Sequence, residues 1–284
     1  RDQYVRDHQG LPGRMSAPCA GCSAPGTGCG DQSGADPEPD AIRALLVDMD
    51  GVLFHGERPL PGAARMLRRV APIPHLFVTN NPILTPDEVV RKFARLGLPV
   101  PRSERILTSA EATAAFLEQR KPGFRYFAVG AAGLHRALAA VGWRDAERAD
   151  FVVVGEGAGL DYQSLAIGIN LILKRGAALI VTNPDTTVDA VRDDGEHWIL
   201  PGGGALVAPF VVATGVEPLV IGKPSPLLYR MALDRLGAKA EHCLMIGDRP
   251  DTDILGAQRL GMRTALVRTG RFGPGETLPH ACGA

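Results

Sequence analysis

Short apolar runs alternate with helical patterns along the chain from residue 41 onward. The first run begins at Leu45, and later ones fall at 75–78, 124–129, 151–154, 178–181, 218–221, 243–246 and 264–267. Strands that alternate with helical segments are typical of a parallel sheet covered by helices. We therefore predict an α/β protein with a largely parallel sheet.

One helix can be predicted together with its ends. Thr85 and Glu88 have the spacing of a capping box, Pro86 suits the first helical position, and Gly97 would end the helix. The buried stripe of this helix would comprise Val89, Val90, Phe93 and Leu96. A second helix is predicted over 161–176.

Composition and charge limit the kinds of molecule that this protein is expected to bind. The 284 residues, 45% of them hydrophobic, are enough for about two domains. The 31 basic and 31 acidic residues balance, so there is no bulk attraction to nucleic acid or to an anionic membrane. No apolar run reaches the roughly 18 residues that span a bilayer. We expect a cytoplasmic protein that binds a small molecule, with no nucleic acid or membrane partner.

Residues 1–40 differ from the rest of the chain. They are rich in Ala, Gly, Pro and Ser, which predicts a flexible arm. Cys19, Cys22 and Cys29 could supply three ligands of a zinc or iron–sulfur site, but no fourth ligand follows at a familiar spacing. A plain arm with reduced thiols is the favoured interpretation, and metal binding stays the alternative.

Asp48 and Asp50 stand at the end of the first predicted strand. Side chains two residues apart point the same way along a strand, so the two carboxylates would form one site. Two such anions need a cation or a shared proton. Gly51 would let the backbone turn sharply and let a ligand approach. The alternative is a surface turn, in which Asp and Gly are common.

Other polar residues also follow predicted strands. Thr79 with Asn80 and Asn81 follows the run at 75–78, Lys223 follows 218–221, and Asp248 follows 243–246. The carboxyl edge of a parallel sheet is where ligands bind. One such residue alone is usually a turn, a cap or a solvated side chain. Their recurrence at one edge predicts a single site.

The charges of these residues indicate the chemistry. Mg²⁺ would offset a concentration of carboxylates, namely Asp48, Asp50, Asp248 and Asp253. Lys223 and Thr79 could then bind a phosphate group. Asp48 could attack phosphorus to form an aspartyl phosphate, while Asp50 protonates the leaving oxygen and then activates water.

Four motifs in order resemble the haloacid dehalogenase superfamily of phosphatases. They are Asp48-Met49-Asp50-Gly51-Val52-Leu53, Thr79-Asn80-Asn81, Gly222-Lys223-Pro224 and Gly247-Asp248-Arg249-x-x-Thr252-Asp253. The second and fourth are similar to the NagD and 4-nitrophenylphosphatase branch, which carries the class IIA cap and includes phosphoglycolate and pyridoxal phosphate phosphatases.

The resemblance implies a role for each motif residue. Asp48 would be the nucleophile and Asp50 the general acid and base. Phosphate would be bound by Thr79, Asn80, Asn81 and Lys223. Mg²⁺ would be held by Asp48, the Asp50 carbonyl and Asp248, with Asp253 in support.

The resemblance also implies a domain organisation. A Rossmann-like core would comprise 41–83 and 202–284, and an inserted α/β cap at 84–201 would select substrates. Asn183-Pro184-Asp185 matches a cap motif of the family, although the same residues form ordinary turns. A homodimer through the cap is one candidate assembly. We interpret the glycine-rich stretches at 130–133 and 155–159 as loops, because neither has the spacing of a dinucleotide-binding motif.

Two features depart from the family pattern. Pro82 stands where relatives often have Ser, and the chain stops soon after Gly270, without the usual closing strand and helix. The predicted function is Mg²⁺-dependent hydrolysis of small phosphomonoesters. The alternatives are a phosphotransferase or mutase of the same superfamily, a receiver-like signalling module, and a non-catalytic protein that binds a phosphorylated ligand.

Overall fold

Two parallel β-sheets organise the part of the chain that the structure describes. A computed structural model describes residues 41–191 and 196–271. The predicted arm at 1–40, with its three cysteines, lies outside these residues. The first sheet has the order β14-β13-β1-β4-β5. Its strands are β1 (Ala44–Val47), β4 (His75–Thr79), β5 (Ile106–Thr108), β13 (Cys243–Gly247) and β14 (Arg263–Leu266).

The second sheet has the order β12-β9-β8-β6-β7, and its strand pairs are also parallel. Its strands are β6 (Arg125–Val129), β7 (Trp143–Arg144), β8 (Phe151–Val154), β9 (Ala178–Val181) and β12 (Leu219–Val220). Two antiparallel pairs complete the strands: β2 (Phe54–His55) with β3 (Arg58–Pro59), and β10 (Thr187–Val191) with β11 (His197–Pro201). The predicted α/β fold with a parallel sheet is confirmed.

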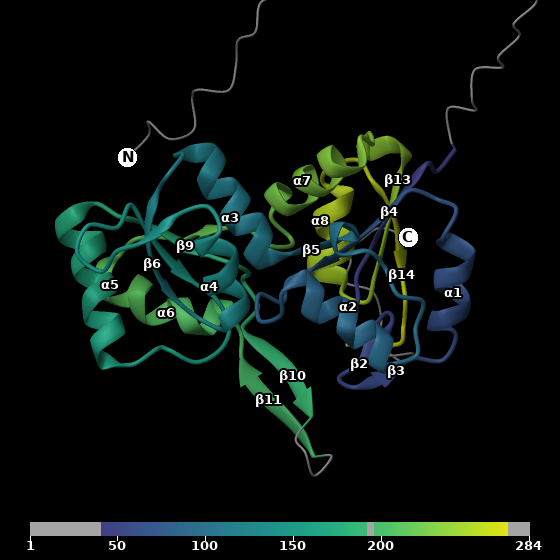
Figure 1. The fold of residues 1–284 in the computed structure, drawn as a ribbon, viewed down its shortest axis with the longest axis horizontal. Helices are drawn as coiled ribbons and strands as arrows, with labels where there is room; N and C mark the ends of the chain where they lie inside the picture. The colour runs from purple at the N-terminus through teal and green to yellow at the C-terminus, as the bar shows by residue number, and fades with distance from the viewer. Residues whose placement is uncertain (1–40, 192–195, 272–284) are drawn as a thin grey trace, which may run out of the picture. The chain divides into compact units, whose positions relative to one another are not determined.

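Helices connect the strands of both sheets (Figure 1). The α-helices are α1 (Ala63–Val70), α2 (Pro86–Arg95), α3 (Ser109–Arg120), α4 (Ala132–Ala139), α5 (Tyr162–Arg175), α6 (Gly203–Thr214), α7 (Pro226–Leu236) and α8 (Leu255–Gln258). Short turns are η1 (Ser103–Arg105), η2 (Ala240–His242) and the π-helical turn η3 (Pro250–Ile254). Among the described residues, no helix is both long and apolar enough to cross a membrane.

The predicted capping residues act as expected. Thr85 accepts from the backbone N–H of Glu88, and the Glu88 side chain accepts from the backbone N–H of Thr85, so the capping box of α2 is complete. Asp161 caps α5 in the same way through Ser164. Both helix starts therefore follow from local sequence.

Apolar residues of β1 alternate between the two faces of the first sheet. Leu45 and Val47 pack in one cluster, together with residues of α1 and α2. Leu46 packs in the other, with residues of α3 and α7. Complete burial of each such side chain contributes about 1.5–3 kcal/mol. This packing fixes where the carboxyl end of β1 lies in the sheet, and hence the position of Asp48.

One predicted strand lies in the other sheet, and one strand of the first sheet was not predicted. The predicted core at 202–284 includes the run 218–221, but β12 pairs with β9, so that Leu219 lies opposite Ile180 and Val220 opposite Val181. The edge of the first sheet is instead β5, which pairs with β4. β5 has three residues and β12 has two, which is too few for a periodic pattern to assign either strand to a sheet.

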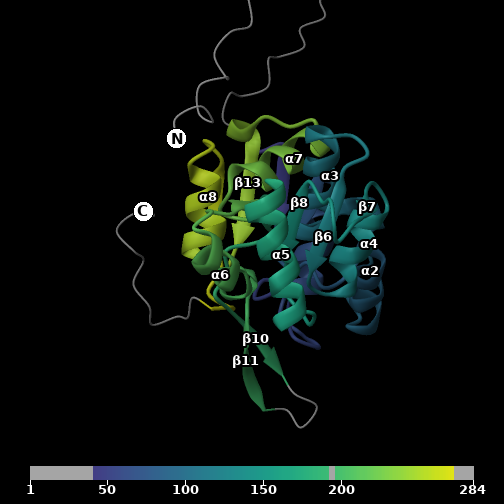
Figure 2. The same ribbon diagram turned by 90° about the vertical axis from the view of Figure 1, so that its left-hand side faces the viewer.

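The residues that form the second sheet and its helices therefore do not match the predicted cap range, 84–201. α2 and β5 fall inside that range, yet α2 packs on the first sheet and β5 belongs to it. β12 falls outside the range and belongs to the second sheet. The antiparallel pair β10 and β11 projects from the helices and sheets in both views (Figures 1 and 2).

Candidate active site

The chain leaves β1 at two acidic residues that differ in exposure. The Asp48 side chain is 9% exposed, whereas the Asp50 side chain keeps 53% of its surface accessible. Gly51 follows with a φ of 79°, a left-handed conformation that favours glycine. A Cβ atom at Gly51 would collide with the carboxylate of Asp248. Glycine therefore lets this turn lie directly against Asp248.

Asp50 lies near one lysine and remains open to the pocket. Lys92 of α2 lies 3.9 Å from Asp50 Oδ1, and its ammonium lies 4.0 Å from the centre of the Phe54 ring. The surrounding pocket walls raise the pKa of Asp50 above its ordinary value, while Lys92 and Lys223 act in the opposite direction. A carboxyl group with this exposure and a raised pKa can exchange protons with a bound molecule.

Lys223 joins carboxylates from two distant parts of the chain. Its Nζ donates to Asp48 Oδ1 at 2.8 Å and to Asp253 Oδ1 at 2.6 Å. Burial alone would lower the pKa of Lys223, but Asp253 and Asp48 outweigh it and raise the pKa. Lys223 is therefore a permanent positive charge beside Asp48.

Three carboxylates surround this lysine. Oxygen atoms of Asp48, Asp248 and Asp253 lie within 4.8 Å of one another, and all three residues are buried. Burial raises the pKa of Asp48 well above its ordinary value, and it also raises the pKa of Asp248. Three acidic groups with one lysine leave negative charge uncompensated. The group is therefore a suitable oxygen donor set for a divalent cation.

The π-helical turn η3 holds Asp253 in this group. The buried Tyr229 hydroxyl donates to the carbonyl oxygens of Thr252 at 2.6 Å and Asp253 at 3.1 Å. The backbone N–H of Arg249 donates to Asp253 Oδ2 at 3.1 Å. π-helical turns occur frequently at functional sites. Here the turn aims Asp253 at Lys223.

The turn after β4 supplies the predicted phosphate-binding residues. Thr79 is buried and accepts from the backbone N–H of Asn81 at 3.1 Å. The Asn81 side chain accepts from the backbone N–H of Ile83. The Asn80 side chain instead donates to Asp185 Oδ2 at 3.0 Å and to the Lys223 carbonyl at 2.9 Å. The amide group of Asn80 thus connects this turn to the segment after β9.

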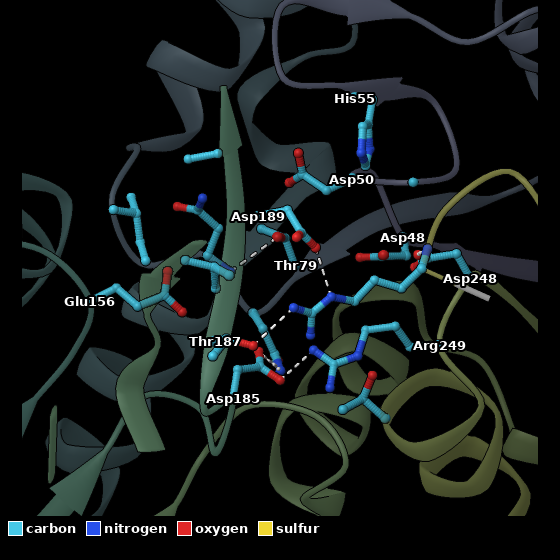
Figure 3. Close-up of a pocket in the computed structure, with 18 of the residues that line it drawn as sticks. Asp48, Asp50, His55, Thr79, Glu156, Asp185, Thr187, Asp189, Asp248 and Arg249 are labelled. Carbon is cyan, nitrogen blue, oxygen red and sulfur yellow. Dashed lines mark hydrogen bonds and ion pairs between the residues drawn. The ribbon is translucent and has the colours of Figure 1, made fainter. Parts of the chain in front are cut away.

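A cavity of about 250 Å³ lies over these residues. The predicted site residues that line it are Asp48, Asp50, Thr79, Asn80, Asn81, Lys223 and Asp248. Asp253 contacts this group through Lys223. Figure 3 shows Asp48 and Asp248 on one side of the pocket and Glu156 on the other. The structure therefore brings all the sequence-predicted residues to one place.

The opposite wall comes from the second sheet. Glu156 follows β8, and Asp185 follows β9. The glycines that open α6 let the helix start lie directly against Asp185, because a Cβ atom at Gly202 or Gly204 would collide with backbone of 184–185. Glu156 accepts from Asn183 Nδ2 at 2.8 Å, and the same amide donates to the Asn80 carbonyl at 2.8 Å.

Two arginines tie this wall to the first sheet, and Figure 3 shows one of them, Arg249, beside Asp185. Arg249 donates to Asp185 Oδ1 at 2.5 Å. Arg271 donates to Asp189 Oδ2 of β10 at 2.7 Å, and its backbone N–H donates to Asp248 Oδ2 at 2.8 Å. The segment after β14 therefore contacts both the hairpin and the acidic group.

Several lining residues were not predicted from the sequence. They are His55, Glu156, Thr187, Asp189, His197, Arg249 and Arg271. A signal for Glu156 existed, because it follows a strand of the second sheet just as Asp48 follows a strand of the first. We interpreted 155–159 only as a loop. Arg271 and the hairpin residues carry no local pattern that indicates a site.

Two family models match this chain, one mostly in its first half and one near its end. A family model described as haloacid dehalogenase-like hydrolase matches residues 45–144. A second model, described as HAD-hydrolase-like, matches residues 220–282. The two matches include every motif on which the predicted resemblance rests.

Individual relatives cover most of the chain. A dihydroxyacetone phosphatase of Corynebacterium glutamicum is 42% identical over 231 residues, which are 80% of this chain and 81% of the relative. NagD of Escherichia coli K-12 has a TM-score of 0.73 at 33% identity, over 81% of this chain and 89% of NagD. A Mycobacterium tuberculosis glycerol phosphate phosphatase, solved in complex with magnesium, has a TM-score of 0.71 at 35% identity, over 82% and 69% of the two chains.

Proposed function

Since the chain belongs to the haloacid dehalogenase-like hydrolases and is a phosphoric monoester hydrolase, we propose that it hydrolyses small sugar phosphates with Mg²⁺ through an aspartyl-phosphate intermediate. The observation that carries this proposal is the contact of Lys223 with both Asp48 and Asp253 beside Asp248, at the base of a cavity that Asp50 also lines. The names of two relatives, a dihydroxyacetone phosphatase and a glycerol phosphate phosphatase, support the substrate class.

The metal would be held by Asp48, Asp248 and the Asp50 carbonyl, with Asp253 in support. The excess of buried carboxylates over lysine supports a divalent cation here. When bound, Mg²⁺ would neutralise charge on the phosphoryl oxygens and let the anionic substrate approach the carboxylates. A similar glycerol phosphate phosphatase was solved both with magnesium and with calcium, which supports a divalent cation.

The reaction would proceed in two displacements. An oxygen of Asp48 attacks phosphorus as the bond to the leaving oxygen breaks, and the Asp50 carboxyl group gives that oxygen its proton. Asp50, now a carboxylate, takes a proton from water as the water oxygen attacks phosphorus of the aspartyl phosphate and the bond between phosphorus and the Asp48 oxygen breaks. The products are an alcohol and inorganic phosphate, and both aspartates return to their starting states. Asp50 suits this role because it combines exposure with a raised pKa.

Lys223 and the turn after β4 would bind the phosphoryl group. Lys223 keeps its charge in this site, and Thr79, Asn80 and Asn81 line the same cavity. We further propose that the first sheet with its helices is the catalytic core. The second sheet, with its helices and the β10–β11 hairpin, would be the cap that selects substrates.

Turnover of p-nitrophenyl phosphate tests the proposal. We expect release of inorganic phosphate and p-nitrophenol with Mg²⁺, loss of turnover with EDTA, and loss of at least about 10³-fold in Asp48→Asn, because Asn is a poor nucleophile. Adding Mg²⁺ back should restore turnover by the wild-type enzyme. Comparable rates in all these conditions would reject the proposed function.

A further inference from the structure

Glu156 is a buried acidic residue for which the proposed reaction has no use. It is 3% exposed, lines the cavity, and lies across it from Asp48 and Asp248 (Figure 3). Its Oε1 accepts from Asn183 Nδ2 at 2.8 Å. An acidic group buried without a cation is costly, so its presence in a ligand cavity calls for a partner.

The cations near Glu156 are already paired. Among the described residues that line the cavity, Arg249 donates to Asp185 and Asp251, and Arg271 donates to Asp189. Lys223 donates to Asp48 and Asp253, at the end where the phosphoryl group would lie. The wall that includes Glu156 therefore offers a carboxyl group to a ligand and no unpaired ammonium or guanidinium group.

The size of the cavity limits what can reach Glu156. About 250 Å³ lies below the roughly 300–1,000 Å³ of typical ligand pockets. A phosphoryl group placed beside Asp48 leaves space for only a short organic part, no larger than a small ring. The far end of such a short molecule would lie against Glu156.

We propose that Glu156 determines which leaving group is accepted: its carboxyl group hydrogen-bonds a terminal hydroxyl of a short, uncharged, hydroxylated phosphomonoester, and it repels a leaving group that ends in a carboxylate. This inference rests on the proposed function and adds a specificity-determining residue to it.

The acid–base behaviour of Glu156 agrees with this role. Burial raises the pKa of Glu156 to about 7; Asp185 and Asp50 raise it further, while the Asn183 hydrogen bond and Arg249 lower it. Near neutral pH the group is present both as a carboxylic acid and as a carboxylate. A hydroxyl can bond to either form, since it both donates and accepts.

Two three-carbon phosphates make a matched test. Glycerol 3-phosphate ends in a hydroxymethyl group, and 3-phosphoglycerate ends in a carboxylate. We would measure kcat/KM for both with Mg²⁺ at pH 8, and for p-nitrophenyl phosphate as a reference. The variants are Glu156→Gln, which keeps the acceptor for Asn183 and removes the charge, and Glu156→Asp, which keeps the charge. Glu111→Gln, in α3 and outside the cavity, is the control, because burial also raises the pKa of Glu111.

We expect the wild type to prefer glycerol 3-phosphate, and Glu156→Gln to lower the preference ratio at least about tenfold, because like charges brought together cost several kcal/mol. Glu156→Asp and Glu111→Gln should keep the wild-type preference. A wild type that prefers 3-phosphoglycerate, or a ratio in Glu156→Gln within about twofold of the wild type, would overturn the role of Glu156. If p-nitrophenyl phosphate is also not hydrolysed by the wild type, the proposed function itself fails.

Discussion

Lys223 neutralises two buried carboxylates of the site, so we expect its loss to have a large effect. It is 3% exposed and lies between two buried carboxylates, so its removal would leave both without a cation. Breaking a buried pair by removing one partner costs about 3–5 kcal/mol. We expect Lys223→Met to lower the free energy of unfolding by this amount in urea titrations with EDTA, and to abolish turnover.

A surface ion pair provides the control for Lys223. Lys121 donates to Asp150 at 2.6 Å, but more than half of the Lys121 side chain is exposed. Exposed pairs contribute about 1 kcal/mol or less. Lys121→Met should therefore have a small effect on unfolding and none on turnover. Equal losses of stability in the two variants would contradict the importance assigned to burial.

Glu156 makes stability depend on pH with a definite sign. Its pKa is about 7 in the folded protein and ordinarily 4.5, so between these values the folded state holds a proton that the unfolded state has lost. Rising pH therefore destabilises the fold from about pH 4.5, and the penalty is complete above pH 7. It amounts to at most about 3 kcal/mol.

Glu156→Gln should remove this penalty. The variant cannot ionise, so we expect it to be more stable than the wild type at pH 8, and this advantage should shrink at pH 5. Urea unfolding of the wild type and the variant at both pH values measures the difference. A variant advantage that is the same at pH 5 and pH 8 would show that Glu156 does not titrate as described.

Individual side-chain contacts link the β10–β11 hairpin to the segment after β14. Arg271 contacts Asp189 and Thr187 of β10 from the segment after β14. Both Arg271 and Asp189 are partly exposed, so their pair is open to screening by salt. The hairpin contributes residues to the cavity lining, and this pair links it to the segment after β14.

We expect Asp189→Asn and Arg271→Gln each to raise KM several-fold with a smaller change in kcat. The reason is that a loosened hairpin weakens substrate binding more than it slows the chemical step. The double variant should be little worse than either single one, since both remove the same interaction. Arg125→Gln, which breaks the pair with Asp145 in the second sheet, is the control. Additive effects on KM would argue against a shared contact.

The sequence predicts strand ends better than it predicts strand neighbours. Asp48, Thr79 and Asp248 follow apolar runs that do pair in the first sheet, so their convergence could be predicted. Lys223 follows a strand of the other sheet, and it reaches Asp48 only through tertiary packing. β5 was missed because three residues show no period. Propensity and capping are local, whereas the partner of a short edge strand is decided by the rest of the fold.

Across the described chain, the candidate site joins side chains from both sheets. The first sheet contributes Asp48, Thr79 and Asp248, which motif spacing could predict. The second contributes Glu156 and Asp185, and the hairpin contributes Asp189. Of these, Asp185 belongs to the predicted motif Asn183-Pro184-Asp185, whereas Glu156 and Asp189 stand in no motif, and only the assembled cavity shows that they line it. The sequence therefore predicted the residues of the first sheet that line the cavity, while the structure was needed to find those of the opposite wall.

Trapping the covalent intermediate tests whether Asp48 attacks phosphorus. The enzyme would be quenched in acid during turnover of p-nitrophenyl phosphate with Mg²⁺, reduced with borohydride, digested, and examined by mass spectrometry. Borohydride converts an aspartyl phosphate to homoserine, so we predict homoserine at position 48 only in samples that contained substrate, and none in Asp48→Asn. Homoserine at Asp50 or Asp248, or no homoserine while p-nitrophenol is being released, would contradict the proposed mechanism.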